Sequence, residues 1–294
     1  MHSDTQNPQA PTRARRRWLG AFFLILIAVG FAGVAAFELA QVWVPRVFGD
    51  DGLIRYERTQ RRLRADFGLP LPDQPDLTRL SERLADSGLK QGAPVLVRIF
   101  KREFELEIWM QRDGKFHRFA TYPICRWSGW LGPKLTEGDR QAPEGFYTVD
   151  ASALNPNSRW FRSFNLGYPN AFDRSQGRTG SLIMVHGGCG SIGCFAMTNR
   201  QMAEIWQLVT AALGNGQKRF QVQVYPFRMS DAAMAEHVQD PDVAFWRNLK
   251  AGNDLFEGSS VPPKVSVCNG RYRFEAGEIG TADSDPVDVR CTNN

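Results

Sequence analysis

The chain has 294 residues, of which 43% are hydrophobic and 23% are charged, and this composition excludes a wholly disordered protein. The length is sufficient for one sizeable globular domain with appendages. The formal net charge is +5, but four arginines between positions 13 and 17 supply much of the excess, and the remaining charges are mixed in sign. The charge therefore gives no support for a nucleic-acid partner.

The first 44 residues predict a membrane anchor. Residues 1–17 are polar and basic, and we expect them to form a disordered tail. Residues 19–37 carry no charged side chain, and a helix rising about 1.5 Å per residue over this run nearly spans a hydrocarbon core. We therefore assign residues 18–44 to a transmembrane anchor, and the arginines before it predict a cytoplasmic N-terminus with the remainder exported. A cleaved secretory signal is the alternative, and it exports the remainder as well.

Residues 45–92 predict a helical linker region. Apolar residues at helical spacing between Leu53 and Phe67 indicate an amphipathic helix, which the Gly- and Pro-rich run 68–75 breaks. A second, short helix is expected from Leu77 to Asp86.

Residues 93–228 predict a β-rich domain. Runs of β-forming and alternating residues are typical of a β-meander with strands at 95–100, 104–110 and 115–124. Two following stretches are rich in turn residues or aromatic residues, and we predict that 126–147 and 155–178 are irregular.

A strand, a glycine-rich loop and a helix come next. Ser181–Val185 is a short apolar strand that leads to His186, and Thr198 with Gln201 forms a capping box for a helix that ends near Gly214. The later segments are a strand at 219–225, an extension of helix and strands at 229–275, and a flexible tail at 276–294. These elements predict an α+β fold.

The glycine-rich loop holds the densest group of nucleophiles and bases in the chain. Cys194 follows Gly193 and precedes the predicted helix, whose unpaired N–H groups and dipole favour a thiolate and an oxyanion. His186 is placed to act as base and then as acid, and the carbonyl of Gly187 is a candidate to orient its ring. This pattern indicates acyl transfer through a cysteine nucleophile.

Two other interpretations of the loop remain open at this point. Cys189 is a competing nucleophile, and His186, Cys189 and Cys194 suggest a zinc site with Cys125 or His117 as the fourth ligand. Cysteines other than Cys194 are expected to be buried or bonded as disulfides, because the chain is predicted to be exported. A Cys268–Cys291 bridge is one such hypothesis, but the sequence does not establish the pairing.

The loop resembles the active-site signature of the YkuD-type L,D-transpeptidases, through His186-Gly187 and Ser191-Ile192-Gly193-Cys194. The chain is most similar to the YafK-like branch of that family, and the motifs shared with it extend over residues 94–275. These motifs are Ile99–Lys101, Leu131–Lys134, Glu137–Asp139, Pro143–Tyr147, Asn165–Arg174 and Tyr225–Met229.

The resemblance implies a mostly β catalytic domain with packed helices. The predicted anchor before it differs from a simple secretory signal, and with this anchor we expect the chain to lie in the inner membrane with the domain facing the periplasm. It implies Cys194 as nucleophile and His186 as proton donor and acceptor, with Gly193 in the oxyanion loop. It also gives candidate substrate-binding residues and requires neither a metal nor a cofactor. The candidates are Ser191, Lys134, Glu144 and Tyr168.

The implied substrate is the peptide stem of peptidoglycan. Transfer of the acyl group to an amine is the first hypothesis, and hydrolysis that releases a peptide or a lipoprotein from the stem's diamino acid is the second. An inactive wall-binding anchor is the third. Family members often carry His and Arg where this chain has Ile192 and Ala196, and this departure leaves the acyl acceptor open.

Overall fold

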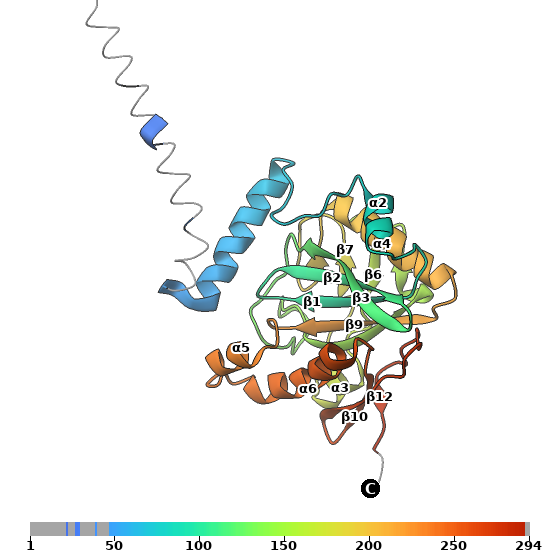
Figure 1. Ribbon diagram of the computed structural model, residues 1–294. Helices are drawn as coiled ribbons and strands as arrows, with labels where there is room; N and C mark the ends of the chain where they lie inside the picture. The colour runs from blue at the N-terminus through green and yellow to red at the C-terminus, as the bar shows by residue number, and fades with distance from the viewer. Residues whose placement is uncertain (1–21, 23–26, 30–38, 40–46, 292–294) are drawn as a thin grey trace, which may run out of the picture. The chain divides into compact units, whose positions relative to one another are not determined.

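The computed structural model describes residues 22, 27–29, 39 and 47–291 (Figure 1). Most of the predicted anchor, including the greater part of residues 19–37, lies outside the described residues. Among the described helices, none is both long and apolar enough to cross a membrane. The chain divides into two units, Met1–Tyr56 and Glu57–Asn294, and the features below belong to the second.

A five-stranded sheet forms the centre of the second unit, with strand order β3-β2-β1-β9-β4. β1 pairs in parallel with β9, and the other neighbours are antiparallel. The strands are β1 (Val95–Phe100), β2 (Glu105–Arg112), β3 (Lys115–Pro123), β4 (Gly145–Asp150) and β9 (Arg219–Tyr225). The predicted meander and the strand at 219–225 are therefore present, and β4 is a strand that we had included in the irregular stretch.

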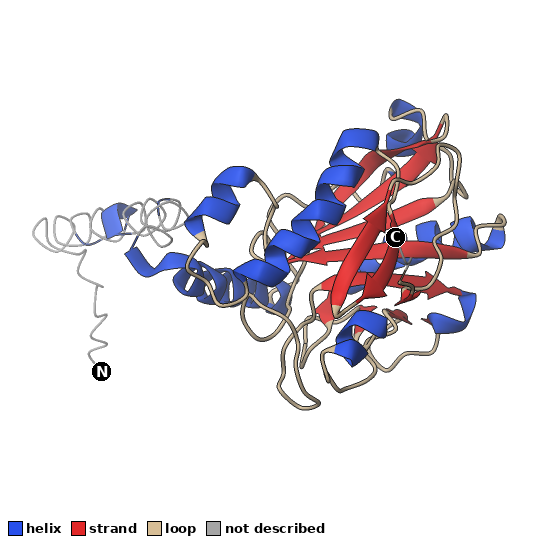
Figure 2. Cartoon of the chain, turned by 90° about the horizontal axis from the view of Figure 1, so that it is seen from below, coloured by secondary structure: helices blue, strands red, loops and turns tan. Residues whose placement is uncertain are grey.

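Helices cover both faces of this sheet (Figures 1 and 2). On one face, Tyr122 of β3 donates a hydrogen bond to Glu204 of α4 (Asn199–Gly214). On the other, Arg98 of β1 bonds to Asn253 and Glu257 of α6 (Val243–Ser259). Because both faces are covered, every residue of β1 is buried, which explains its nearly continuous apolar sequence.

The C-terminal extension completes the core below the sheet. β10 (Lys264–Cys268) pairs with β11 (Arg271–Glu275) and with β12 (Asp288–Val289). Trp246 and Leu249 of α6 share a buried cluster with Phe100 and Tyr225 of the sheet. Short helices α2 (Leu80–Asp86) and α5 (Asp231–Glu236) lie in the segments before the sheet and before α6.

Two predictions about irregular or flexible segments are wrong. Residues 276–291 are not a free tail, because β12 joins a sheet and Cys268 is bonded to Cys291. The stretch after β4 is also partly regular: it contains a 3₁₀ turn (Ala151–Ala153), β5 (Leu154–Asn155), β6 (Ser163–Asn165) and α3 (Ala171–Ser175).

A buried ion pair fixes the irregular segment 126–144 to the end of β1. The Lys101 ammonium donates to Glu144 at 2.8 Å, and both side chains are fully buried. Lys101 also donates to the carbonyls of Gly132 and Ala142, while Glu144 accepts from the Gly132 N–H and the Trp246 indole. The pair thus holds both ends of a loop that has almost no secondary structure of its own.

We expect Lys101→Met to destabilise the protein by about 3–5 kcal/mol, because it leaves the Glu144 carboxylate buried without its cation. Urea unfolding followed by tryptophan fluorescence would measure the change. The matched control is Lys115→Met on the exposed start of β3, where we expect a change within about 0.5 kcal/mol. Equal stability of the two variants would contradict the structural role of the pair.

Candidate active site

A second, smaller sheet carries the glycine-rich loop. β7 (Met184–His186) pairs antiparallel with β6 and parallel with β8 (Phe195–Ala196). The loop 187–194 connects β7 to β8, so both of its ends are fixed by strand pairing. His186 is the last residue of β7, where the sequence analysis placed it, although the strand begins at Met184 and not at Ser181.

All five cysteines lie in the described part of the chain, and Cys194 alone is free. Cys125, just beyond β3, is bonded to Cys189 in the loop, and Cys268 is bonded to Cys291. The hypothesis of a Cys268–Cys291 bridge is confirmed. Because a disulfide sulfur is neither a thiolate ligand nor a nucleophile, the zinc interpretation and the Cys189 alternative are both wrong. The described residues contain no group of potential metal ligands.

The Cys194 thiol sits in a pocket of backbone polar groups. The Met184 N–H donates to its sulfur at 3.4 Å, and the thiol donates to the Leu182 carbonyl at 3.6 Å. Leu182 has a φ of 53°, an uncommon conformation for leucine that turns the chain into β7. Burial raises the pKa of the thiol, while the Met184 N–H and the Lys134 cation act in the opposite direction.

The N-terminus of α4 does not stabilise a thiolate at Cys194, contrary to the expectation from the sequence. Phe195 and Ala196 form β8 before α4 begins at Asn199, so Cys194 lies outside the first turn of the helix. The capping box predicted for Thr198 and Gln201 is confirmed, and Thr198 already accepts from the Gln201 N–H. Local sequence spacing suggested proximity to the helix, but strand pairing with β7 separates the two.

The His186 imidazole is held as a neutral base. Its Nδ1 lies 2.6 Å from the Gly187 carbonyl oxygen, and because a carbonyl only accepts, Nδ1 must carry the proton. Nε2 then presents a lone pair. Burial lowers the pKa of the ring, against the opposing effect of the Gly187 carbonyl. Trp160 lies beside the ring, with centroids 6.1 Å apart.

The side chains of Cys194 and His186 make no hydrogen bond to each other in the described structure. The Cys194 sulfur contacts Leu182 and Met184 instead. Hydrogen bonds between catalytic groups often tighten only when substrate binds. Cys194 accepts from the backbone N–H of Met184, which lies two residues before His186 on β7. The arrangement is suited to a thiol that loses its proton during the reaction and not before it.

Ser128 is a site residue that the sequence analysis missed. Its hydroxyl oxygen accepts from the Gly193 N–H and lies 3.2 Å from the Ser191 hydroxyl, which donates to the Cys194 carbonyl at 2.6 Å. Because the Ser191 hydroxyl already donates its hydrogen bond to the Cys194 carbonyl, the Ser128 hydroxyl must be the donor between the two serines. The N–H of Gly193, expected to face an oxyanion, is therefore engaged by Ser128 in this structure.

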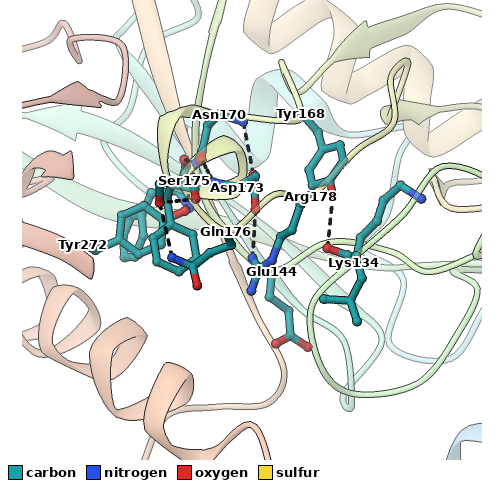
Figure 3. Close-up of polar contacts among 12 residues, drawn as sticks. Lys134, Glu144, Tyr168, Asn170, Asp173, Ser175, Gln176, Arg178 and Tyr272 are labelled. Carbon is teal, nitrogen blue, oxygen red and sulfur yellow. Dashed lines mark hydrogen bonds and ion pairs between the residues drawn. The ribbon is translucent and has the colours of Figure 1, made fainter. Parts of the chain in front are cut away.

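Three candidate substrate-binding residues make contacts within the protein (Figure 3). Glu144 is fully buried by the partners described above. Tyr168 is buried and donates to the Lys134 carbonyl at 3.1 Å, and Lys134 is buried and ion-paired with Asp139 at 2.5 Å. The polar groups of all three residues are engaged within the protein, and the Lys134 charge also acts on Cys194, so direct substrate contact by Glu144, Tyr168 and Lys134 stays a prediction.

The comparisons with known proteins agree with this site. A family model described as the YkuD L,D-transpeptidase catalytic domain matches residues 97–252. The Escherichia coli (strain K12) protein named YafK is 48% identical over 181 residues, which are 62% of this chain and 74% of that protein, and its counterpart in strain O157:H7 matches equally.

Solved structures are less similar. The helical cell shape determining protein Pgp2 from Campylobacter jejuni has 23% identity and a TM-score of 0.38, over 61% of this chain and 67% of that one. Bd1075 of Bdellovibrio bacteriovorus has 19% identity and a TM-score of 0.33, over 55% and 60%.

We expect iodoacetamide to modify Cys194 at a rate that keeps rising as the pH passes 9.0, the ordinary pKa of a thiol, because burial raises the pKa and only the thiolate reacts. Mass spectrometry of peptides at successive times would measure the rate. A rate that is already constant between pH 6 and 8 would show a preformed thiolate. It would contradict the interpretation that the Cys194 thiol and the His186 imidazole are both neutral.

We expect Ser128→Ala to accelerate hydrogen exchange at the Gly193 amide by about tenfold, because that N–H loses its acceptor. Exchange followed by mass spectrometry on loop peptides would detect the change. Ser175→Ala, which removes a hydroxyl bonded to the Phe172 carbonyl on α3, is the control and should leave loop exchange unaltered. If both variants exchange like the parent, Ser128 does not fix the loop.

Proposed function

Because this chain belongs to the family of YkuD L,D-transpeptidase catalytic domains, we propose that it is a cysteine acyltransferase that acts on the peptide stems of peptidoglycan. One observation carries the proposal: the single free thiol, Cys194, lies on a loop that begins at His186. The ring of His186 is fixed by Gly187 with Nε2 left to accept a proton. These are the two groups that acyl transfer through a thioester requires.

In the first step, Nε2 of His186 takes the thiol proton as the Cys194 sulfur attacks the carbonyl carbon of the bond between the L-centre and the D-centre. The carbon–nitrogen bond then breaks, and the leaving amine takes the proton from the imidazolium. The product is a thioester between the stem and Cys194. Proton transfer during attack suits a thiol whose pKa burial raises and an imidazole whose pKa burial lowers.

In the second step, an acceptor amine gives a proton to His186 and attacks the thioester carbon. The carbon–sulfur bond breaks, and the sulfur recovers its proton from the imidazolium. Attack by water in place of the amine would release the stem, or a lipoprotein attached to its diamino acid. We therefore keep hydrolysis as the second candidate, since the same Cys194 and His186 perform both reactions.

We further propose that the chain is anchored in the inner membrane by residues 19–37 with the catalytic domain in the periplasm. The uncharged run after the N-terminal arginines supports this location. The two disulfides also support it, because disulfides persist in oxidising compartments such as the periplasm.

We expect Cys194→Ala and His186→Ala each to lower turnover of purified sacculi on the order of 10³-fold or more, because each removes a group that forms or breaks bonds. Mass analysis of the products would separate new cross-links, which indicate transfer, from released peptide or lipoprotein, which indicates hydrolysis. His117→Ala, on β3, is the control and should retain activity. Full cellular function with Cys194→Ala would favour an inactive wall-binding anchor over both enzyme hypotheses.

A further inference from the structure

Two pockets that share Arg200 lie along α4, and we refer to them together as the groove. Its first part, of about 310 Å³, is lined by linker residues between 65 and 74, by Gly188 and by residues 198–200 at the start of α4. Its second part, of about 420 Å³, is lined by Leu77 and Leu80 and by residues of α4 as far as Thr210. Arg200 lines both parts. Each part falls within the size range of ligand sites, about 300–1,000 Å³.

Asn199, which lines the first part of the groove, packs against the residue that follows His186. Asn199, the neighbour of Arg200, lies so close to Gly187 that a Cβ added there would be 2.7 Å from its side-chain oxygen. Gly187 is the residue whose carbonyl holds the His186 ring.

The charges of the groove are unbalanced. Its two acidic side chains are already paired, Asp66 with Arg62 and Glu204 with Arg83. By contrast, within the described residues the guanidinium groups of Arg162 and Arg200 make no hydrogen bond or ion pair. Arg162 lies over the Trp206 ring at 5.8 Å. The groove thus contains two guanidinium groups without a carboxylate partner among the described residues, and one of them lies over aromatic rings.

We propose that this groove binds the carboxylate-bearing part of a stem peptide, with Arg200 and Arg162 pairing with its carboxylates. Guanidinium groups match carboxylates in a bidentate geometry, and the adjacent apolar wall suits the aliphatic parts of a peptide. This inference rests on the proposed function and names the part of the substrate that sets specificity. The linker wall lies before residue 97, where the match to the family model begins, so it is a contribution of this chain beyond the matched domain.

The test is a binding titration with the full chain carrying Cys194→Ala, which prevents turnover. The ligands are a stem tetrapeptide and the same peptide with its carboxylates converted to amides. By isothermal titration calorimetry, we expect Arg200→Ala and Arg162→Ala each to raise the Kd for the carboxylate peptide by about tenfold. The amidated peptide should bind all of these proteins equally weakly.

Arg247→Ala is the matched control, because Arg247 is also exposed and helical but lies on α6, away from the groove. Its Kd should equal that of the parent. The inference is overturned if Arg200→Ala binds like Arg247→Ala, if amidation leaves the Kd unchanged, or if glycan strands without peptide bind as tightly as the tetrapeptide.

The two proposals can fail separately. If the chain with Cys194 intact processes sacculi while the Arg200 and Arg162 variants keep the parental Kd, the function stands and the groove assignment is overturned. If the arginine variants lose binding but the intact chain leaves sacculi unchanged, the groove assignment stands and the proposed function falls.

Discussion

The buried pair of Lys101 and Glu144 is the constraint on which the rest of the site depends. A charge in the interior is tolerated only when it is paired and its remaining hydrogen-bonding positions are filled, and this pair fills them with backbone groups of Gly132 and Ala142. The segment between β3 and β4 is thereby fixed, although it has almost no secondary structure of its own. Ser128, which lies in that segment, contacts the catalytic loop at Gly193.

The glycine-rich loop 187–194 is held from several directions at once. Strand pairing fixes its two ends, Ser128 engages its far side, and the Cys125–Cys189 bond joins its middle to the end of β3. Gly187 is held as well, since its N–H donates to the carbonyl of Phe161 at 3.1 Å. Catalytic groups that are fixed in this way lose little entropy when substrate binds, which is the usual physical basis of preorganisation.

The sequence was sufficient to predict those elements and candidate site residues that depend on a short local pattern. The strands of the meander follow from short runs of β-forming residues, and the start of α4 follows from the Thr198–Gln201 capping box. The pairing of His186 with Cys194 as candidate site residues also came from one short motif, although their catalytic roles stay predictions.

The sequence was insufficient where the signal depends on contacts between distant segments. Ser128 is an unremarkable serine in a glycine-rich run, and only the folded chain brings it to Gly193. Glu144 and Tyr168 lie in motifs that suggested substrate contact, but their polar groups face the interior. Residues 276–291 looked like a tail because a polar segment can still be fixed by a two-residue strand and a disulfide. In each case tertiary contacts override local composition.

The Cys125–Cys189 bond also determines which cysteine of the loop keeps a free thiol as the chain matures. Until that bond forms, a newly made chain carries Cys189 and Cys194 as thiols only five positions apart on a glycine-rich segment, which bends easily. A bridge between these two would consume the candidate nucleophile and leave Cys125 unpaired. In the folded chain, the bond across 64 residues holds Cys189 away from this short-range bridge, and the thiol of Cys194 stays free.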